Sequence, residues 1–421
     1  LQKRSQISII VESAEPREVH YFALLFGFSA SAINPYLVNE IIAEQIAMGN
    51  LPECSFEEAI ANYNKAVGKG ILKVMNKIGI STLNSYRGSQ LFECLGLKSE
   101  LVRHYFPNTP SRIEGIGLFE LEKEMASRHR KAFHSQHIPG DPDLEPGGEY
   151  RWRRKGEKHL FNPLSVALLQ KAVRNNEPDT YREYARMINQ QSRQLMTLRG
   201  MFEFTNFDPI PLEAVEPWTE IVKRFKTGAM SYGSISEQVM LARAMAAREW
   251  NTFTCTGEGG YPPSLVPYRD HVITQIATGL FGVREETIRY APILEFKYAQ
   301  GAKPGLGGHL LGDKATTSVA EMRESVPWVS LFSPFPFHSV YSVEDHRKHV
   351  DWVKTVNPEA LVSVKVSTPH DVDMVAVGSY FAGANVIHLD GSYGGTGAAP
   401  EIAKKNIAMP IELAIPIEPS I

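Results

Sequence analysis

The sequence is poor in cysteine and has no long hydrophobic run. Its 421 residues include only Cys54, Cys94 and Cys255, and no two of these stand at the spacing of a C-x-x-C metal or redox pair. Three thiols cannot all pair with one another, and such sparse usage is typical of a reducing cytoplasm, where we expect the protein. The cysteine spacing gives no reason to expect a metal site. No stretch of about 18 apolar residues is present, so we expect no membrane span.

Charge of one sign is also scarce. The formal net charge is -3, so no strong overall field favours nucleic acid or an anionic membrane as a partner. The basic run at 151–155 (RWRRK) is more typical of a solvated loop than of a phosphate site. The sequence contains no P-loop, no H-E-x-x-H, no G-x-S-x-G and no G-x-G-x-x-G after a strand, which argues against a nicotinamide site on this chain.

The two ends carry no start or stop signals. Residue 1 is not Met and runs directly towards a strand-like segment, and the last residues have no polar tail. We therefore expect both ends to be cuts through a longer protein, with a split gene as the alternative.

The first half mixes helical patterns with a few strand-like runs. A Pro-, Gly- and His-rich stretch at 134–164 predicts a long irregular connection. The periodicity around it predicts one buried strand and five helices: a strand at 6–12, helices at 17–26, 34–48 and 56–78, and two helices within 165–198.

From residue 227 onward, short apolar strands alternate with Gly-rich loops and helices. The expected strands are 228–231, 252–255, 293–297, 329–332, 361–366 and 385–389. Serial β-loop-α units predict a parallel sheet with right-handed crossovers, and five or six of them suit a (β/α)8 TIM-type barrel. We thus expect an α/β domain over 1–205, including the connecting arm, and a barrel domain over 206–421 that is incomplete at its C-terminus.

The segment 295–314 (EFKYAQGAKPGLGGHLLGDK) is the strongest candidate for a binding loop. Lys297 and Lys303 flank a Gly-bearing turn directly after a predicted strand. Glycines let a backbone approach a planar or anionic ligand, and lysine is a compact cation. A flexible surface loop with solvated lysines is the alternative, and the serial strand-helix pattern favours ligand binding.

Three further loops mix glycine with polar side chains. In 384–397 a strand ends in Asp390, followed by a run that includes Gly394 and Gly395, which suits either a ligand cradle or a helix entry that needs positive φ. After the short strands, 227–236 and TGEGG at 256–260 combine glycine with hydroxyls and Glu258. By pattern alone, Glu258 is best explained as a helix-start carboxylate. In 333–345, His338 is best explained as a packed loop histidine.

Taken in series, these motifs resemble the glutamate synthase family. KTGAMSYGSIS, TGEGG, KYAQGAKPGLGGHLLGDK, SPFPFHSVYSVED and DGSYGGTGAAP resemble its FMN-binding domain. VESAEPREVHYFALLFGFSASAINPYL, KGILKVMNKIGISTLNSYRGSQLFE and GEYRWRRKGEKHLFNP resemble its central domain and the joint that follows. The resemblance covers nearly the whole chain, in the family's order.

The resemblance implies an oxidoreductase of glutamate biosynthesis and ammonia assimilation. Ammonia released from glutamine by a glutaminase domain or subunit would condense with 2-oxoglutarate, and reduced FMN would transfer hydride to 2-iminoglutarate. Electrons would come through an iron–sulfur cluster from an NAD(P)H-oxidising small subunit or from ferredoxin. The cysteines for that cluster are not in this chain, so we expect this chain alone to be inactive.

The resemblance also assigns roles by position. Lys303, Arg323 and His309 would bind the oxoacid, and Glu258 would couple the barrel to the ammonia route; Lys303 and Glu258 are the catalytic candidates. The flavin would be held by the following residues: Met230, Ser231, Tyr232, Gln275, Lys297, Lys365, Asp390, Gly394 and Gly395.

Departures from the family's usual pattern leave the substrate open. Leu306 and His309 stand where Glu and Gln are usual, Cys255 replaces Asn, and Tyr261-Pro262 replaces Glu-Asp. The segment between Gly260 and Gln275 is also shorter than in the family's common bacterial form. We therefore expect the chain to belong to a divergent subgroup, archaeal-like or N-methylglutamate synthase-like. The alternative to an active enzyme is a non-catalytic scaffold.

Overall fold

The computed structural model describes residues 6–51, 54–134, 147–148, 151–203, 205–301, 309–332, 337, 339–392 and 408–417. By its internal contacts the chain divides into two compact units, Leu1–Asp141 and Pro142–Ile421, which we describe separately. By these contacts, the connecting arm from residue 147 onward belongs to the second unit. The predicted division into domains 1–205 and 206–421 stays a prediction.

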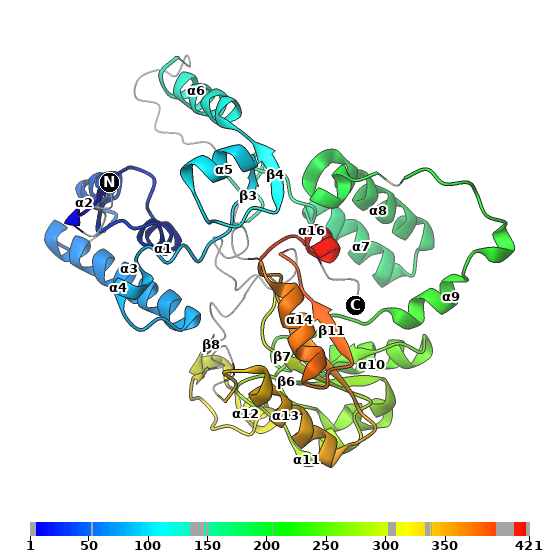
Figure 1. Ribbon diagram of the computed structural model, residues 1–421. Coiled ribbons are helices and arrows are strands. Elements are labelled where there is room, and N and C mark those ends of the chain that lie inside the picture. The colour runs from blue at the N-terminus through cyan, green and yellow to red at the C-terminus, as the bar shows by residue number, and fades with distance from the viewer. Residues whose placement is uncertain are drawn as a thin grey trace. The chain divides into compact units, whose positions relative to one another are not determined.

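The first unit is mainly helical, with two short parallel strand pairs, β1–β2 and β3–β4 (Figure 1). Its core includes Tyr86, which is fully buried and donates its hydroxyl to the carbonyl of Ala23 at 2.8 Å. The elements are β1 (Ile10–Glu12), α1 (Val19–Gly27), β2 (Ala32–Asn34), α2 (Tyr36–Ala47), α3 (Phe56–Ile78), α4 (Leu83–Tyr86), β3 (Leu95–Leu97), α5 (Ser99–Tyr105), β4 (Ile113–Ile116) and α6 (Leu118–His134).

Helix α3 shows how local sequence fixes these boundaries. Ser55 accepts a hydrogen bond from the backbone N–H of Glu58, which caps the first turn. Gly79 ends the helix in the left-handed conformation at φ 80°, which glycine adopts without a Cβ clash. The helix predicted at 56–78 is confirmed.

The second unit is built on a curled, all-parallel sheet of five strands in the order β11-β10-β7-β6-β5. A single bridge between Lys226 and Phe253 adds one more parallel position beyond β5. Such a sheet is compatible with part of a TIM-type barrel, and closure into eight strands stays a prediction. The strands are β5 (Thr254–Cys255), β6 (Val272–Ile276), β7 (Ile293–Lys297), β10 (Leu361–Val366) and β11 (Val386–Leu389).

Helices occupy most of the crossovers between these strands. Among the described residues, none of the helices is both long and apolar enough to cross a membrane. The helices of the second unit are α7 (Pro163–Asn175), α8 (Pro178–Gln191), α9 (Trp218–Ile221), α10 (Glu237–Glu249), α11 (Glu285–Arg289), α12 (Thr317–Arg323), α13 (Val343–Val356), α14 (Val372–Phe381) and α16 (Ile411–Ala414).

Two of the predicted barrel strands are wrong and one strand was missed. Segment 228–231 is not a strand, because the chain leaves the sheet after Lys226 and turns against the loop at 257–259. Of 329–332, only β9 (Leu331–Phe332) is extended, and it pairs antiparallel with β8 (His309–Leu310). Because β7 pairs directly with β10, no place remains between them for another strand. The missed strand is β6.

The outer face of the sheet carries the apolar core. Leu294 and Phe296 of β7 and Val362 of β10 are fully buried, and they cluster with Ile288 of α11 and Val353 of α13. Because side chains alternate along a strand, the residues between these apolar positions point to the opposite, inner face. That inner face is polar.

Candidate active site at the carboxyl ends of the parallel strands

A buried carboxylate, Glu295, lies at the centre of the inner face. It is in the middle of β7, and its side chain is 0% exposed. Its Cα pairs with Gln275 of β6 on one side and Ser363 of β10 on the other, so both neighbours project to the same face. Glu295 thereby collects polar groups from every neighbouring strand.

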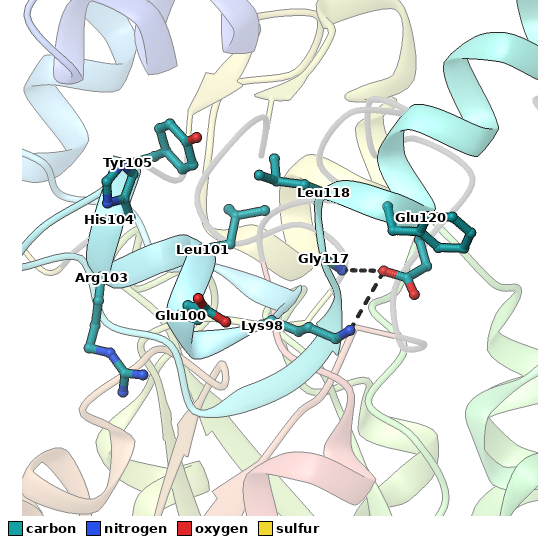
Figure 2. Close-up of a pocket in the computed structure, with 10 residues that line it drawn as sticks. Lys98, Glu100, Leu101, Arg103, His104, Tyr105, Gly117, Leu118 and Glu120 are labelled. Carbon is teal, nitrogen blue, oxygen red and sulfur yellow. Dashed lines mark hydrogen bonds and ion pairs between the residues drawn. The ribbon is translucent and has the colours of Figure 1, made fainter.

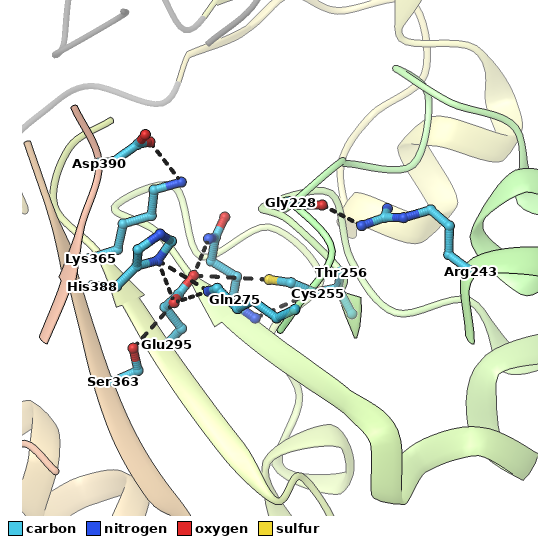
Figure 3. Close-up of polar contacts among 11 residues, drawn as sticks. Gly228, Arg243, Cys255, Thr256, Gln275, Glu295, Ser363, Lys365, His388 and Asp390 are labelled. Atoms are coloured by element: carbon cyan, nitrogen blue, oxygen red, sulfur yellow. Dashed lines mark hydrogen bonds and ion pairs between the residues drawn. The ribbon is translucent and has the colours of Figure 1, made fainter. Parts of the chain in front are cut away.

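Five side chains converge on this carboxylate (Figure 3). We call Glu295 and these five partners the Glu295 layer. The partners are Lys226 Nζ at 2.7 Å, Gln275 Nε2 at 2.8 Å, His388 Nδ1 at 2.9 Å, Ser363 Oγ at 3.2 Å and the more distant Cys255 Sγ at 4.0 Å. A buried charge is stable only when it is paired and hydrogen-bonded, and this layer supplies both.

The layer lowers the pKa of one of its groups, Glu295, and raises the pKa of another, Cys255. Burial alone would raise the pKa of Glu295, but the hydrogen bond from His388 and the Lys226 ammonium outweigh it, and the net pKa is well below the usual range. Burial and the nearby Glu295 charge raise the pKa of the Cys255 thiol to about 11. Glu295 is therefore a carboxylate at neutral pH, and Cys255 is a protonated thiol.

A second charged layer lies one strand repeat towards the carboxyl ends. Lys297 follows Glu295 by two residues, and Lys365 follows Ser363 by two, so both face inward above the Glu295 layer. Lys365 Nζ lies 3.1 Å from Asp390 Oδ2, as Figure 3 shows, and Lys297 Nζ lies 3.5 Å from Glu258 Oε1. Both lysines are mostly buried, with side chains 9% and 15% exposed.

Arg323 brings a third cation towards Glu258, the carboxylate that pairs with Lys297. It ends α12 and is 9% exposed, with its guanidinium 5.4 Å from the ring centre of Phe281. Burial lowers the pKa of Arg323, and the charge of Glu258 acts in the opposite direction. Its Nε has no hydrogen-bond partner among the described residues. Glu258 thus pairs with Lys297 and acts electrostatically on Arg323 at one edge of the sheet.

Glycines allow the loops at this edge to pack backbone against backbone. A Cβ on Gly257 would lie 2.7 Å from Ser231 Oγ, and one on Gly259 would lie 2.8 Å from the backbone nitrogen of Tyr232. The backbone N–H of Glu258 donates to Ser231 Oγ at 3.2 Å, which fixes this carboxylate-bearing turn. The TGEGG loop and the 230–232 segment are therefore one structural unit.

The structure brings most of the predicted site residues together. The residues found at this edge are Ser231, Tyr232, Glu258, Gln275, Lys297, Arg323, Lys365 and Asp390. Met230 lies on the same segment and is 41% exposed. Lys303, Gly394, Gly395 and His338 lie outside the described residues, and of His309 only the backbone is described, in β8.

Sequence reasoning missed the Glu295 layer. Its signal was present, because ILEFK alternates apolar and charged residues within one buried strand. Lys226 opens the KTGAMSYGSIS motif and His388 lies in the strand predicted at 385–389, but neither residue was given a role. Their convergence depends on strand register, which the chain alone does not reveal.

Two cavities lie away from these layers. In the first unit, a cavity of about 590 Å³ is bordered by α5 and the start of α6, where Lys98 pairs with Glu120 at 3.7 Å (Figure 2). This pair is about half exposed, so solvent screens it. A second cavity of about 620 Å³ adjoins Tyr298, His346 and Val366 on the outer face of the sheet. Within the described residues, no group of three His, Cys, Asp or Glu side chains could hold a metal ion.

Comparison with known proteins gives one consistent result. Residues 159–419 match the family region described as "Conserved region in glutamate synthase", and residues 1–98 match "Glutamate synthase central domain". The chain is 42% identical over 419 residues to the glutamate synthase [NADPH] large chain of Bacillus subtilis (strain 168). It is 40% identical to glutamate synthase [NADH] of Schizosaccharomyces pombe and 36% identical to ferredoxin-dependent glutamate synthase of Pyropia yezoensis. These matches cover 98% of this chain but only 27%, 20% and 29% of those three proteins.

Proposed function

Because this chain belongs to the glutamate synthase family, we propose that the inner edge of its parallel sheet is part of a flavin-dependent site that makes L-glutamate. The observation that carries the proposal is the pair of mostly buried ion pairs, Lys297 with Glu258 and Lys365 with Asp390. The buried Arg323 lies close enough to Glu258 to feel its charge. Mostly buried cations at the carboxyl ends of barrel strands suit a planar cofactor and a doubly charged oxoacid.

The residues at this edge fit FMN. Gln275 Oε1 is a buried acceptor with no donor among the described residues, and so it is available to a ligand. Gly257 and Gly259 leave room for close backbone approach at 230–232, the segment proposed to face the ring. When bound, FMN would supply the hydride that reduces 2-iminoglutarate.

The chain's own residues orient the reactants and exclude water. Lys297 lies beside the proposed ring position, and Lys365 can stabilise negative charge there. Arg323 offers a planar fork for a substrate carboxylate, and its burial strengthens that ion pair relative to one in water. Glu258 holds Lys297 in place through its ion pair. Lys303 and His309 complete the proposed oxoacid site, and Gly394 and Gly395 the flavin site.

The remaining partners belong to the whole protein. We propose that 2-oxoglutarate and glutamine-derived ammonia are the substrates, that a glutaminase domain or subunit supplies the ammonia, and that the protein works in the cytoplasm. The names of the relatives mention NADPH, NADH or ferredoxin, which suggests an NAD(P)H-oxidising small subunit or ferredoxin as the electron source. An iron–sulfur cluster finds no ligand set among the described residues, and we assign this chain no step through it.

Substitution of Arg323 tests the proposal. In the flavin-loaded full-length protein, Arg323→Lys should raise the KM for 2-oxoglutarate about tenfold, since one of two parallel hydrogen bonds is lost. Arg289→Lys is the matched control, because Arg289 is exposed and pairs with the equally exposed Glu285 on α11. An unchanged KM for Arg323→Lys would contradict the role of Arg323. A full-length wild-type protein with neither bound flavin nor turnover would favour a non-catalytic scaffold.

A competition between amines tests the substrate. The proposal expects ammonia to support turnover, and faster turnover with methylamine would instead favour an N-methylglutamate synthase-like activity. Lys303→Ala should raise the KM for the oxoacid in either case, so a normal KM in that variant would contradict the assignment of Lys303.

A further inference from the structure

Apart from Gln275, the Glu295 layer has no role in the function proposed so far, although it lies next to the proposed flavin site. We propose that Glu295 is a positioning residue that fixes the side-chain amide of Gln275, so that Gln275 Oε1 faces the bound ring and selects a ring edge that carries an N–H group. This inference depends on the proposed function, because it assumes a flavin above the layer.

The first step concerns the direction of one hydrogen bond. The amide of Gln275 lies 2.8 Å from Glu295 Oε1, and a carboxylate can only accept. Gln275 must therefore turn its NH₂ group towards Glu295. The orientation of this amide follows from charge and does not depend on how its two terminal atoms were assigned.

The second step explains why Glu295 stays ionised. Lys226 and His388 both lie within 2.9 Å of its Oε2, and Ser363 adds a neutral donor. A protonated Glu295 could donate to Gln275 and reverse the amide, so the Lys226 ammonium beside Oε2 maintains the orientation. Among the residues that the structure describes, Oε1 is thereby left to Gln275, with the weak Cys255 thiol as a second neighbour.

The third step concerns the atom that remains. With its NH₂ committed to Glu295, Gln275 presents Oε1 on the other side, towards the level of Lys365 and Asp390 in Figure 3. Gln275 is 3% exposed, and this oxygen has no donor among the described residues. A buried acceptor without a donor is costly, so a ligand N–H is its natural partner.

The chemical consequence is selectivity for one edge of a heterocycle. The flavin ring carries an N–H at its N3 position, flanked by two carbonyl groups that can only accept. A fixed carbonyl acceptor favours that N–H and disfavours a ring in which the position is methylated, because the buried oxygen would then remain unpaired. The two lysines above the layer can serve the neighbouring carbonyl oxygens.

Binding of two flavins tests this inference without measuring turnover. The full-length apoprotein is titrated with FMN and with 3-methyl-FMN, and flavin fluorescence gives each Kd. We expect wild type to prefer FMN by about tenfold, the value of one well-placed buried hydrogen bond. Glu295→Gln should reduce that ratio to about threefold or less, because a neutral amide neighbour lets Gln275 adopt either orientation.

Ser363→Ala is the matched control, since it removes another donor to Glu295 but leaves the Gln275 contact unchanged. It should keep the tenfold preference. The exchange variant Glu295→Gln/Gln275→Glu restores an acceptor at position 275 and should recover the preference. The exchange variant also keeps the proposal testable if the single variant Glu295→Gln does not fold.

Each outcome has one meaning. Full discrimination by a folded Glu295→Gln protein, or equal loss in Ser363→Ala, overturns the positioning role while the flavin proposal stands. Equal affinity of wild type for both flavins overturns the assignment of Gln275 Oε1. No flavin binding by wild type overturns the proposed function itself, and the inference with it.

Discussion

Removal of the Lys226 ammonium is the most informative test of the Glu295 layer. We expect Lys226→Met to lower the free energy of unfolding of the second unit by about 2 kcal/mol. Breaking a buried ion pair costs about 3–5 kcal/mol when the remaining charge has no other partner. Here Gln275, His388 and Ser363 still donate to Glu295, and the side chain of Lys226 is 27% exposed, so water can reach part of the vacated space. Both facts reduce the cost.

Equilibrium unfolding in urea at pH 7, followed by tryptophan fluorescence, measures this change. Lys223→Met is the matched control, because Lys223 makes the same kind of pair with Glu220 but with both side chains at least 41% exposed. An exposed pair of this kind contributes at most about 0.5 kcal/mol. If the two variants lost the same stability, the buried pair would contribute nothing and the reasoning about this layer would be wrong.

The pH dependence gives a second check on the same variant. The pKa of Glu295 is lowered in the folded protein, so its stabilising contribution is fully present above the unfolded pKa of about 4.3 and is lost as pH falls towards the folded value. The deficit of Lys226→Met should therefore be constant from pH 7 to about 5 and should shrink below about pH 4. A deficit that grows on acidification would contradict this sign.

Three further outcomes are expected. Gly257→Ala should cost at least about 2 kcal/mol in urea unfolding, because φ is +67° and the new Cβ would meet Ser231, whereas Gly49→Ala, at φ +73° with open space around it, should cost only about 1 kcal/mol. In the native protein at pH 8, Cys255 should react with a thiol reagent at least about a hundredfold more slowly than the half-buried Cys54, because Cys255 is buried and its pKa is raised to about 11. Peptide mapping of the labelled protein measures the two rates, and equal labelling of both cysteines would contradict the prediction. Burial lowers the pKa of His346 to about 4. The contribution of His346 to folding stability is therefore present above the unfolded pKa of about 6.5 and is lost as pH falls towards 4. His346→Gln should remove about 2 kcal/mol of this pH dependence, and parallel curves of stability against pH for the two proteins would contradict the prediction.

The sequence predicted those parts of the fold that depend on local pattern. The strands at 293–297 and 361–366 and the helix at 56–78 were identified correctly, because long periodic runs and capping residues are local signals. Strand β6 was missed because VITQI mixes polar and apolar residues, although it is buried throughout. The apolar run at 329–332 looked like a barrel strand, but direct pairing of β7 with β10 excludes it.

Lys297 and Asp390 were named as candidates because each stands at the carboxyl end of a predicted strand, whereas Glu258 became a candidate only through the family resemblance. What the sequence could not reveal was which of these charges meet. The ion pairs of Lys297 with Glu258 and of Lys365 with Asp390 depend on sheet order and register, which no single segment encodes. Interior charges such as Glu295 were missed for the same reason.

The layered inner face also determines where this protein can change length. Each inward residue of β7 lies in a fixed row with its neighbours, so deleting one residue before Glu295 would rotate Phe296 into the polar interior and Glu295 onto α13. Insertions and deletions should therefore accumulate between strands, while strand lengths stay constant. An engineer who grafts a new loop should therefore preserve the count of residues within every strand and leave the tightly packed 257–259 turn unchanged.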